Sequence, residues 1–231
     1  MPGNTISVLH LKEGKSFLHG DTNSSTMYPS DIFSRMYGDE QKKPNLIYPK
    51  QEEAPSEIDD VLQTNIFNVM LNRRSQRKFE DRGVEDWKLE MVFAAADTAP
   101  TAGGFQGFEI FNVKNHDVKL KLVEAANKQP YVDAPVVLVF CMNPSRVKLN
   151  YPSDVIRKFS VQDATLAAAY AQLAAHALGL SSIWIGMIDE AKAMQALGTD
   201  LIPSSILCLG YPFKMLQPKP KRNVAELIKE I

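Results

Sequence analysis

Apolar residues along the chain follow two kinds of spacing from about residue 58 onward, and each kind predicts a different element. Helical spacing predicts helices over residues 58–70, 84–96, 118–127, 160–179 and 190–197. Alternating or continuous apolar runs predict strands over residues 109–113, 134–142, 182–186 and 205–212. This alternation of helices and strands predicts an α/β or α+β domain, with one sheet and helices on both of its faces.

The stretch from Ser160 to Gly179 carries the strongest helix pattern of the chain. It contains no proline and no internal glycine, and alanine fills most of its positions. Ser160 and Asp163 resemble a capping box, and Gly179 stands where a left-handed cap would end the helix. Leu166 and Tyr170 share one face. We expect a buried central helix, in contact with its own copy if the protein is a dimer; a one-sided surface helix is the alternative.

The first 58 residues differ in composition from the rest of the chain. They are rich in glycine, serine, asparagine, proline and lysine, and their apolar pieces are short. Such a segment reads as an extended arm, either disordered or ordered only by wrapping a neighbour. The predicted organisation is therefore an arm over 1–58, followed by one folded domain over 59–231.

The overall composition is that of an ordinary globular protein. The chain has 231 residues, of which 45% are hydrophobic, and a formal net charge of -1. This balance gives no reason to expect nucleic acid or an anionic membrane as a partner. The start of the chain lacks the pattern of a signal peptide, and Cys141 and Cys208 have no metal or redox spacing, so we expect a cytoplasmic protein with reduced thiols.

Four residues directly after the first predicted helix form a candidate anion site, namely Arg73, Arg74, Ser75 and Arg77. Arginine presents forked, permanently charged donors that suit phosphate, and serine adds a hydroxyl donor. The alternative is a solvated basic face at a helix end, where cations also favour the helix dipole. A second basic cluster, Lys219, Lys221 and Arg222, reads by itself as a solvated tail.

A glycine-rich loop, with glycines at Gly103, Gly104 and Gly107, precedes the first predicted strand. Its backbone must turn sharply or approach a ligand closely, although a plain turn is an equal alternative. It has neither the spacing nor the position of a dinucleotide-binding fingerprint or a P-loop. His176 reads as a structural residue, and no catalytic triad or metal-ligand spacing is present. A cofactor would therefore supply the reactive atom of an enzyme built this way.

Four motifs in order resemble the FMN-dependent nitroreductase family. Arg-Arg-Ser-Gln-Arg-Lys-Phe from Arg73 is similar to its R-R-S-x-R-x-F start, and the stretch from Ala99 to Gln106 to its A-P-S-x-x-N-x-Q-P-W stretch. The 162–186 segment resembles the family's central helix and W-I-G strand, and Leu209-Gly210-Tyr211-Pro212 resembles its closing G-Y-P. The resemblance spans about residues 60–231.

The resemblance implies an α+β, nitroreductase-like fold with a mostly antiparallel central sheet, and an intertwined homodimer that holds FMN at its interface. By position, Arg73, Arg74, Ser75 and Arg77 would hold the phosphate and ribityl chain, and Lys221 or Arg222 would add to the phosphate contacts. The rest of the implied cofactor site is a flavin-ring environment made of Pro100, Thr101, Ala102, Gly103, Gly104, Gln106, Ile185 and Gly186. Pro100, Thr101 and Ala102 would come from the partner chain.

The implied reaction is a ping-pong transfer of a hydride from NAD(P)H through FMN to a small organic acceptor, such as a nitroaromatic compound or a quinone. No catalytic side chain is nominated. Two departures concern the acceptor: Gly104 replaces the family's asparagine, and Gly107-Phe108 replaces Pro-Trp. We expect both glycines to open the site to a bulkier or flatter acceptor. The Pro-Thr-Ala-Gly-Gly form is also similar to the azoline dehydrogenases of modified-peptide biosynthesis.

Two further hypotheses come from other classes of protein. A flavin-binding protein without NAD(P)H turnover would bind FMN that neither nicotinamide donor reduces. An interaction module with merely solvated basic ends would be colourless and would take up no flavin. The ordered set of motifs favours the oxidoreductase, because neither alternative accounts for all four motifs together.

Overall fold

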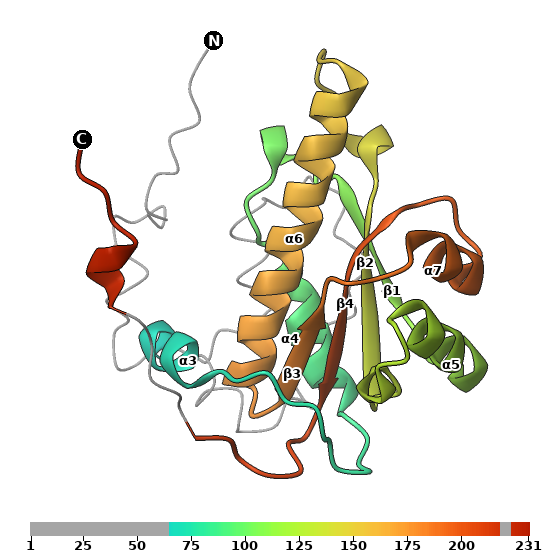
Figure 1. The fold of residues 1–231 in the computed structure, drawn as a ribbon, viewed down its shortest axis with the longest axis vertical. Coiled ribbons are helices and arrows are strands. Elements are labelled where there is room, and N and C mark those ends of the chain that lie inside the picture. The colour runs from blue at the N-terminus through green and yellow to red at the C-terminus, as the bar shows by residue number, and fades with distance from the viewer. Residues whose placement is uncertain (1–64, 218–222) are drawn as a thin grey trace, which may run out of the picture. The chain divides into compact units, whose positions relative to one another are not determined.

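The computed structural model describes residues 65–217 and 223–231, and an antiparallel sheet lies at the centre of that part (Figure 1). The sheet has four strands in the order β1-β2-β4-β3. The strands are β1 (Phe108–Asn112), β2 (Val136–Met142), β3 (Ser181–Ile185) and β4 (Pro203–Gly210). Every neighbouring pair is antiparallel, which confirms the predicted sheet. β3 is an edge strand, and this position leaves one side of it available for other contacts.

Five α-helices are described around this sheet. They are α3 (Ile66–Asn72), α4 (Asp86–Asp97), α5 (His116–Ala125), α6 (Ser153–Ala177) and α7 (Glu190–Leu197). Single 3-10 turns lie at η1 (Ala102–Gly104), η2 (Pro130–Val132), η3 (Pro144–Arg146) and η4 (Val224–Glu226). The predicted helix over 190–197 is confirmed residue for residue. The other described α-helices and strands lie within a few residues of their predicted ranges, apart from the starts of α3 and α6; α3 begins at Ile66, and the predicted range from 58 to 64 lies outside the described residues.

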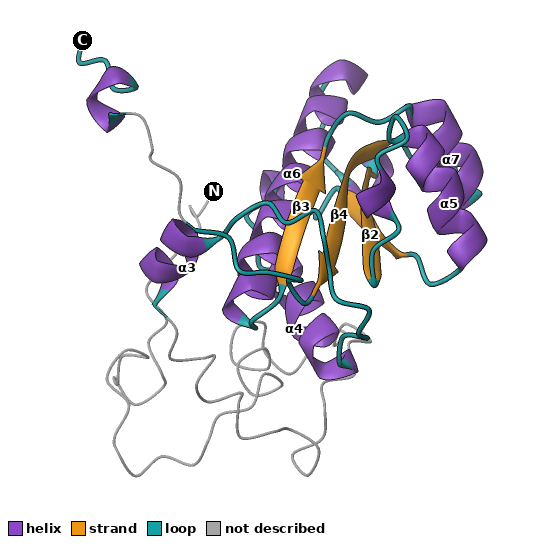
Figure 2. Ribbon diagram, turned by 60° about the horizontal axis from the view of Figure 1, so that its bottom comes forward, coloured by secondary structure: helices purple, strands orange, loops and turns teal. Residues whose placement is uncertain are grey.

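The core has two layers, one on each face of the sheet (Figures 1 and 2). Leu138 and Phe140 of β2 pack with α4 and α6 on one face. Val137 and Val139 of the same strand pack with α5 and α7 on the other face. All seven residues of β2 are buried, as expected for a central strand covered on both sides. The sheet therefore carries helices on both faces, as the sequence predicts.

Helix α6 differs from its predicted form in two ways. It begins at Ser153 rather than at Ser160, so Ser160 and Asp163 lie in its interior and form no capping box. Val155, Ile156 and Phe159 continue the helical spacing toward Ser153, but none of residues 153–159 is buried. The buried face is the alanine face, whereas Leu166 and Tyr170 are 38% and 39% exposed. Alanine lets the helix approach the sheet closely, and this leaves the larger side chains outside.

Two sequence predictions concern features at the limits of the described chain. The arm predicted over 1–58 lies outside the described residues, and so do Lys221 and Arg222. Over the residues that are described, no helix is both long and apolar enough to span a bilayer. The same residues hold no group of three or more histidine, cysteine, aspartate or glutamate side chains that could hold a metal ion.

Candidate functional site

The basic cluster, defined here as Arg73, Arg74 and Ser75, lies beside the start of the edge strand β3. Arg73 caps α3, since its backbone N–H donates to the Val69 carbonyl oxygen at 2.9 Å. The chain then runs extended, and Ser75 forms a parallel bridge with Ser182 of β3. The next backbone N–H donates to the Ser182 carbonyl oxygen at 2.8 Å. These bonds fix the basic cluster against the outer edge of β3.

The basic cluster contains a buried hydrogen-bond donor that has no acceptor among the described residues. The Nη1 atom of Arg74 donates to the carbonyl oxygens of Leu71 (2.7 Å) and Arg73 (2.6 Å), but its Nε atom is buried with no acceptor among the described residues. Burial, and then the charge of Arg74, lowers the pKa of Arg73. Burial, and then Arg73, likewise lowers the pKa of His176 at the end of α6. A buried donor without a partner is rare and costly, so the cluster suits an anionic ligand such as a phosphate.

The opposite end of β3 is open around Gly186. Ile185 is the last residue of the strand and is buried, and Gly186, which follows it, is exposed. A Cβ atom added at Gly186 would meet nothing within 4 Å. From Ser182 to Gly186 the strand covers about 13 Å at the usual rise per residue. The edge strand thus joins a cationic end to an open backbone end, over a length that suits an extended ligand with one phosphate.

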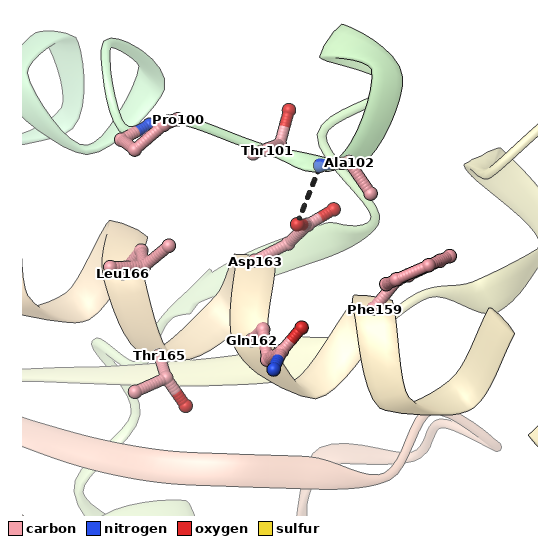
Figure 3. A pocket seen from close by; sticks show the side chains of 8 residues that line it. All are labelled: Pro100, Thr101, Ala102, Phe159, Gln162, Asp163, Thr165 and Leu166. Carbon is pink, nitrogen blue, oxygen red and sulfur yellow. Dashed lines mark hydrogen bonds between the residues drawn. The ribbon is translucent and has the colours of Figure 1, made fainter. Parts of the chain in front are cut away.

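The glycine-rich loop, residues 100–107, lies against the N-terminal half of α6. The carboxylate of Asp163 holds it at two points, as Oδ1 accepts from the Ala102 N–H and Oδ2 from the Gly107 N–H, both at 3.0 Å. Figure 3 shows the first of these bonds between the helix and the loop. Asp163 is only 2% exposed. The loop is therefore tied to the helix through a single buried side chain.

The backbone of this loop is tightly turned. Gly103, Gly104 and Gln106 all have positive φ angles, of 61°, 73° and 48°. Gln106 is not a glycine, and two bonds hold it in this conformation: its N–H donates to Thr101 Oγ1 (3.2 Å), and its Nε2 donates to Asp97 Oδ1 (2.8 Å). Burial raises the pKa of the Asp97 carboxyl. Within this chain, Gln106 thus supports the loop from inside.

A cavity of about 510 Å³ opens between the loop and α6 (Figure 3). It is lined by Pro100, Thr101, Ala102, Phe159, Gln162, Asp163, Thr165 and Leu166. Thr165 also contacts Ser204 of β4 (Oγ1 to Oγ, 3.3 Å), and Ile206 of β4 pairs with Ile185 of β3. The cavity and the open end of β3 therefore lie toward the same end of the sheet. Its volume is within the range of ordinary small-molecule sites.

The sequence-predicted site residues fall into separate groups in the described chain. Arg73, Arg74 and Ser75 come together at the start of β3, near His176. The loop lies near Asp163, 13 residues earlier on α6, and this corresponds to about 20 Å of helix. Arg77 is apart from both groups: its guanidinium lies over the Tyr131 ring, 5.8 Å from the centroid, beside another cavity.

Gly107 does not have the role that the sequence analysis assigns to it. It is buried, and a Cβ atom there would lie 2.7 Å from Val147 Cγ2 and 3.0 Å from both Asp163 Oδ2 and Ser160 Oγ. The expectation that Gly107 opens the site is therefore wrong, because this glycine is required for close packing. Gly104 behaves differently: it is exposed, and an added Cβ would meet nothing within 4 Å.

Asp163 is the site residue that sequence reasoning missed. Its spacing from Ser160 resembles a capping box, and this reading assigned its carboxylate to the helix itself. The signal that could have found it is a single acidic residue within an alanine-rich run that was predicted to be buried. A carboxylate in such a place needs donors from elsewhere in the chain.

An antiparallel sheet with helices on both faces, and a cationic cluster at its edge strand, define an α+β protein that can hold an anionic ligand. The chain belongs to the nitroreductase family: the family's sequence profile, described as "Nitroreductase family", matches residues 70–132 and 129–211. A Methanothermobacter thermautotrophicus protein, named provisionally as an NADH dehydrogenase or NAD(P)H nitroreductase, is 30% identical over 162 residues, which cover 66% of this chain and 80% of that one.

Two Bacillus subtilis proteins extend the comparison. One, named FMN reductase [NAD(P)H], is 27% identical over 174 residues, which cover 68% of this chain and 69% of the relative. The solved structure of NfrA1 nitroreductase superimposes with a TM-score of 0.66 at 27% identity, over 72% of this chain and 74% of that chain. The nitroreductase resemblance drawn from the four motifs is thus confirmed, together with the nitroreductase-like fold.

Proposed function

We propose that this protein is an FMN-dependent oxidoreductase that takes reducing equivalents from NAD(P)H and delivers them to a small organic acceptor, such as a nitroaromatic compound or a quinone. The broader class comes from the family match and the relatives: the chain is an NAD(P)H-dependent flavin oxidoreductase with FMN as its cofactor. The identity of the acceptor belongs to the proposal. When bound, FMN supplies the redox chemistry, while the protein binds it, orients it and shapes the surface that the acceptor meets.

The observation that carries the proposal is the buried, unpaired Nε atom of Arg74 within the basic cluster. Arg73 and Arg74 have no ion-pair partner among the described residues, and burial lowers the pKa of Arg73. A phosphate here would accept charge-assisted hydrogen bonds and neutralise the cluster. We assign Arg73 and Arg74 to the phosphate and Ser75 to the ribityl hydroxyls.

The flavin ring would lie toward the far end of β3. Ile185 and Gly186 supply backbone there, and Gly186 has no side chain to block a flat ligand. The 13 Å or so between Ser182 and Gly186 is of the order of the length of an extended ribityl phosphate plus the near edge of a ring. Arg77, with its guanidinium at Tyr131, would have to leave that ring to contact FMN of the same chain.

A homodimer would complete the site. The exposed outer face of α6 carries Leu166 and Tyr170, and β3 beside it carries Trp184, which is 37% exposed. An apolar stripe of this kind on a central helix favours burial against another subunit. In such a dimer, Pro100, Thr101 and Ala102 of one chain would meet the flavin ring of its partner. This accounts for their distance from the basic cluster of their own chain.

Gly104 is the residue that we assign to the choice of acceptor. It lies at the exposed tip of the loop, and its missing side chain leaves open space. Where the family has an asparagine, this chain would leave room above the flavin for a bulkier or flatter acceptor. Gly107 has no part in this assignment, since it is packed against Val147 and Asp163.

The deciding experiment is a visible spectrum of the purified protein, recorded before and after anaerobic addition of NADH and then of NADPH. A flavin spectrum that bleaches supports the oxidoreductase and identifies the donor. Flavin that neither donor bleaches would indicate a binding protein without NAD(P)H turnover. A colourless protein that takes up no added FMN would overturn the assignment of the basic cluster. Steady-state rates with nitroaromatic compounds and quinones then test the acceptor class.

A further inference from the structure

The carboxyl group of Asp163 is buried and has an unusual pair of partners. It is 2% exposed, and it accepts two backbone hydrogen bonds of 3.0 Å, from Ala102 and Gly107 (Figure 3). Among the described residues it has no ion pair with a lysine, arginine or histidine. Because a buried polar group needs hydrogen-bond partners, these two amides are what satisfies the carboxyl oxygens of Asp163.

Asp163 neither caps α6 nor stabilises its first turn. α6 begins at Ser153, so residue 163 lies almost three turns inside it, beyond the first turn in which an acidic side chain favours the helix dipole. Its two partners lie five residues apart, at the two ends of the segment that contains the glycine turn. One side chain therefore closes the loop on itself and fixes the loop to the helix.

The loop's exposed tip is the part that this bond pair shapes. Gly103 and Gly104 lie between the two anchored amides, and both are exposed with positive φ angles. Thr101, directly before Ala102, lines the same cavity as Asp163, from the loop wall (Figure 3). Because both ends of the segment are held by one rigid group, a change at that group moves the tip.

We propose that Asp163 is a positioning residue for the flavin ring: its buried carboxylate sets the shape of the loop over 100–107 and thereby the surface that meets the ring in the FMN site. It touches neither cofactor nor substrate and acts only through the loop. The inference rests on the proposed function, since it needs FMN in the site. If Asp163 had a purely structural role, its replacement would lower the stability of the protein without changing the contact between the loop and the flavin ring.

The test compares Asp163→Asn with the wild-type protein and with Val137→Ala. Asparagine keeps one acceptor but turns an NH2 group toward the other loop amide, so one of the two anchors is lost. Val137 is fully buried between the sheet and helices α5 and α7, on the face opposite the loop. Its truncation lowers stability without touching the site and provides the matched control. Melting temperatures are measured for all three proteins as purified and after saturation with FMN.

The decisive readout is the affinity for FMN and for riboflavin, measured by quenching of flavin fluorescence. Riboflavin has the same ring and ribityl chain but no phosphate. We expect Asp163→Asn to weaken both ligands by a similar factor of about ten, because the ring end of the site is perturbed. The absorption maximum of the bound flavin should also shift. Val137→Ala should stay within about twofold of the wild type for both ligands, although its melting temperature falls.

Two results would overturn the inference. The first is an Asp163→Asn protein with flavin affinities and flavin spectrum equal to those of Val137→Ala; the second is a loss confined to FMN, which would place the effect at the phosphate. If Asp163→Asn fails to fold, Gly107→Ala replaces it, since its Cβ would lie 3.0 Å from Asp163 Oδ2, and the same criteria apply. A wild-type protein that binds no flavin would instead refute the proposed function itself.

Discussion

Replacement of Arg74 tests the basic cluster most directly. In the free protein, its Nη1 atom is already satisfied by the carbonyl oxygens of Leu71 and Arg73, while its Nε atom is buried without an acceptor. A bound phosphate would supply the missing acceptor. A hydrogen bond to a charged group contributes about 1.5–3 kcal/mol, so Arg74→Ala should weaken FMN binding about ten- to 150-fold.

The structure also predicts what should not change. Riboflavin lacks the phosphate, so its affinity should stay within a few-fold of the wild-type value in Arg74→Ala. The unfolding free energy of the flavin-free protein should change by only about 1 kcal/mol, because two backbone contacts of Arg74 are lost while an unpaired buried donor is removed. Arg74→Lys should recover only part of the FMN affinity, since an ammonium group keeps the charge but not the planar fork.

The assay is flavin fluorescence quenching at two salt concentrations, with FMN and riboflavin in parallel. The difference between the two ligands should shrink in Arg74→Ala, and raised salt should weaken FMN binding less in the variant than in the wild type. Equal losses for FMN and riboflavin would refute the assignment of the phosphate to this cluster. Unchanged FMN affinity would show that the Nε atom of Arg74 faces no ligand at all.

Three further outcomes follow from single residues. Gly104→Asn should fold normally, because its Cβ meets no atom within 4 Å and asparagine tolerates positive φ, but it should narrow the range of acceptors in steady-state assays; an unchanged range would refute the role of Gly104. Burial raises the pKa of Cys141 and Cys208 to about 12, so neither thiol should react with a disulfide reagent at pH 8 until the protein is unfolded. The folded pKa of His176 is lowered, so the unfolded chain binds this proton more readily, and stability in urea should fall as pH drops from 7 toward 5, but less in His176→Gln.

Much of the fold can be predicted from the spacing of apolar residues alone, because the buried positions of the core helices and strands recur at regular intervals. The seven buried residues of β2 could only be a strand covered on both faces, and α7 shows its helical spacing from end to end. The start of α6 at Ser153 was missed. Its first turns extend beyond the core: Val155, Ile156 and Phe159 have helical spacing, but they are only partly buried and stand among polar residues, so the pattern there is weak.

The candidate site also has a part that the sequence predicts and a part that only the structure shows. Arg73, Arg74 and Ser75 are adjacent in sequence, so any fold brings them together, and only their place beside Ser182 had to come from the structure. Gly104 and Gly107 look alike as letters, yet one faces open space and the other is packed against Val147 at 2.7 Å. That difference depends on what the loop meets in three dimensions, and no local pattern encodes it.

For Asp163, the local sequence pattern and the tertiary structure indicate two different roles. Three residues after a serine, a carboxylate satisfies the local rule for a helix start, and this is sufficient reason to read it so. The helix nevertheless begins ten residues earlier, at Ser153, and the carboxylate binds the amides of Ala102 and Gly107 instead. A helix that needs no cap at this position can still keep an acidic residue there, because the loop needs an acceptor. Asp163 thus led to a wrong prediction of the helix start. The same side chain joins α6 to the loop, and this junction is therefore the part of the site to test.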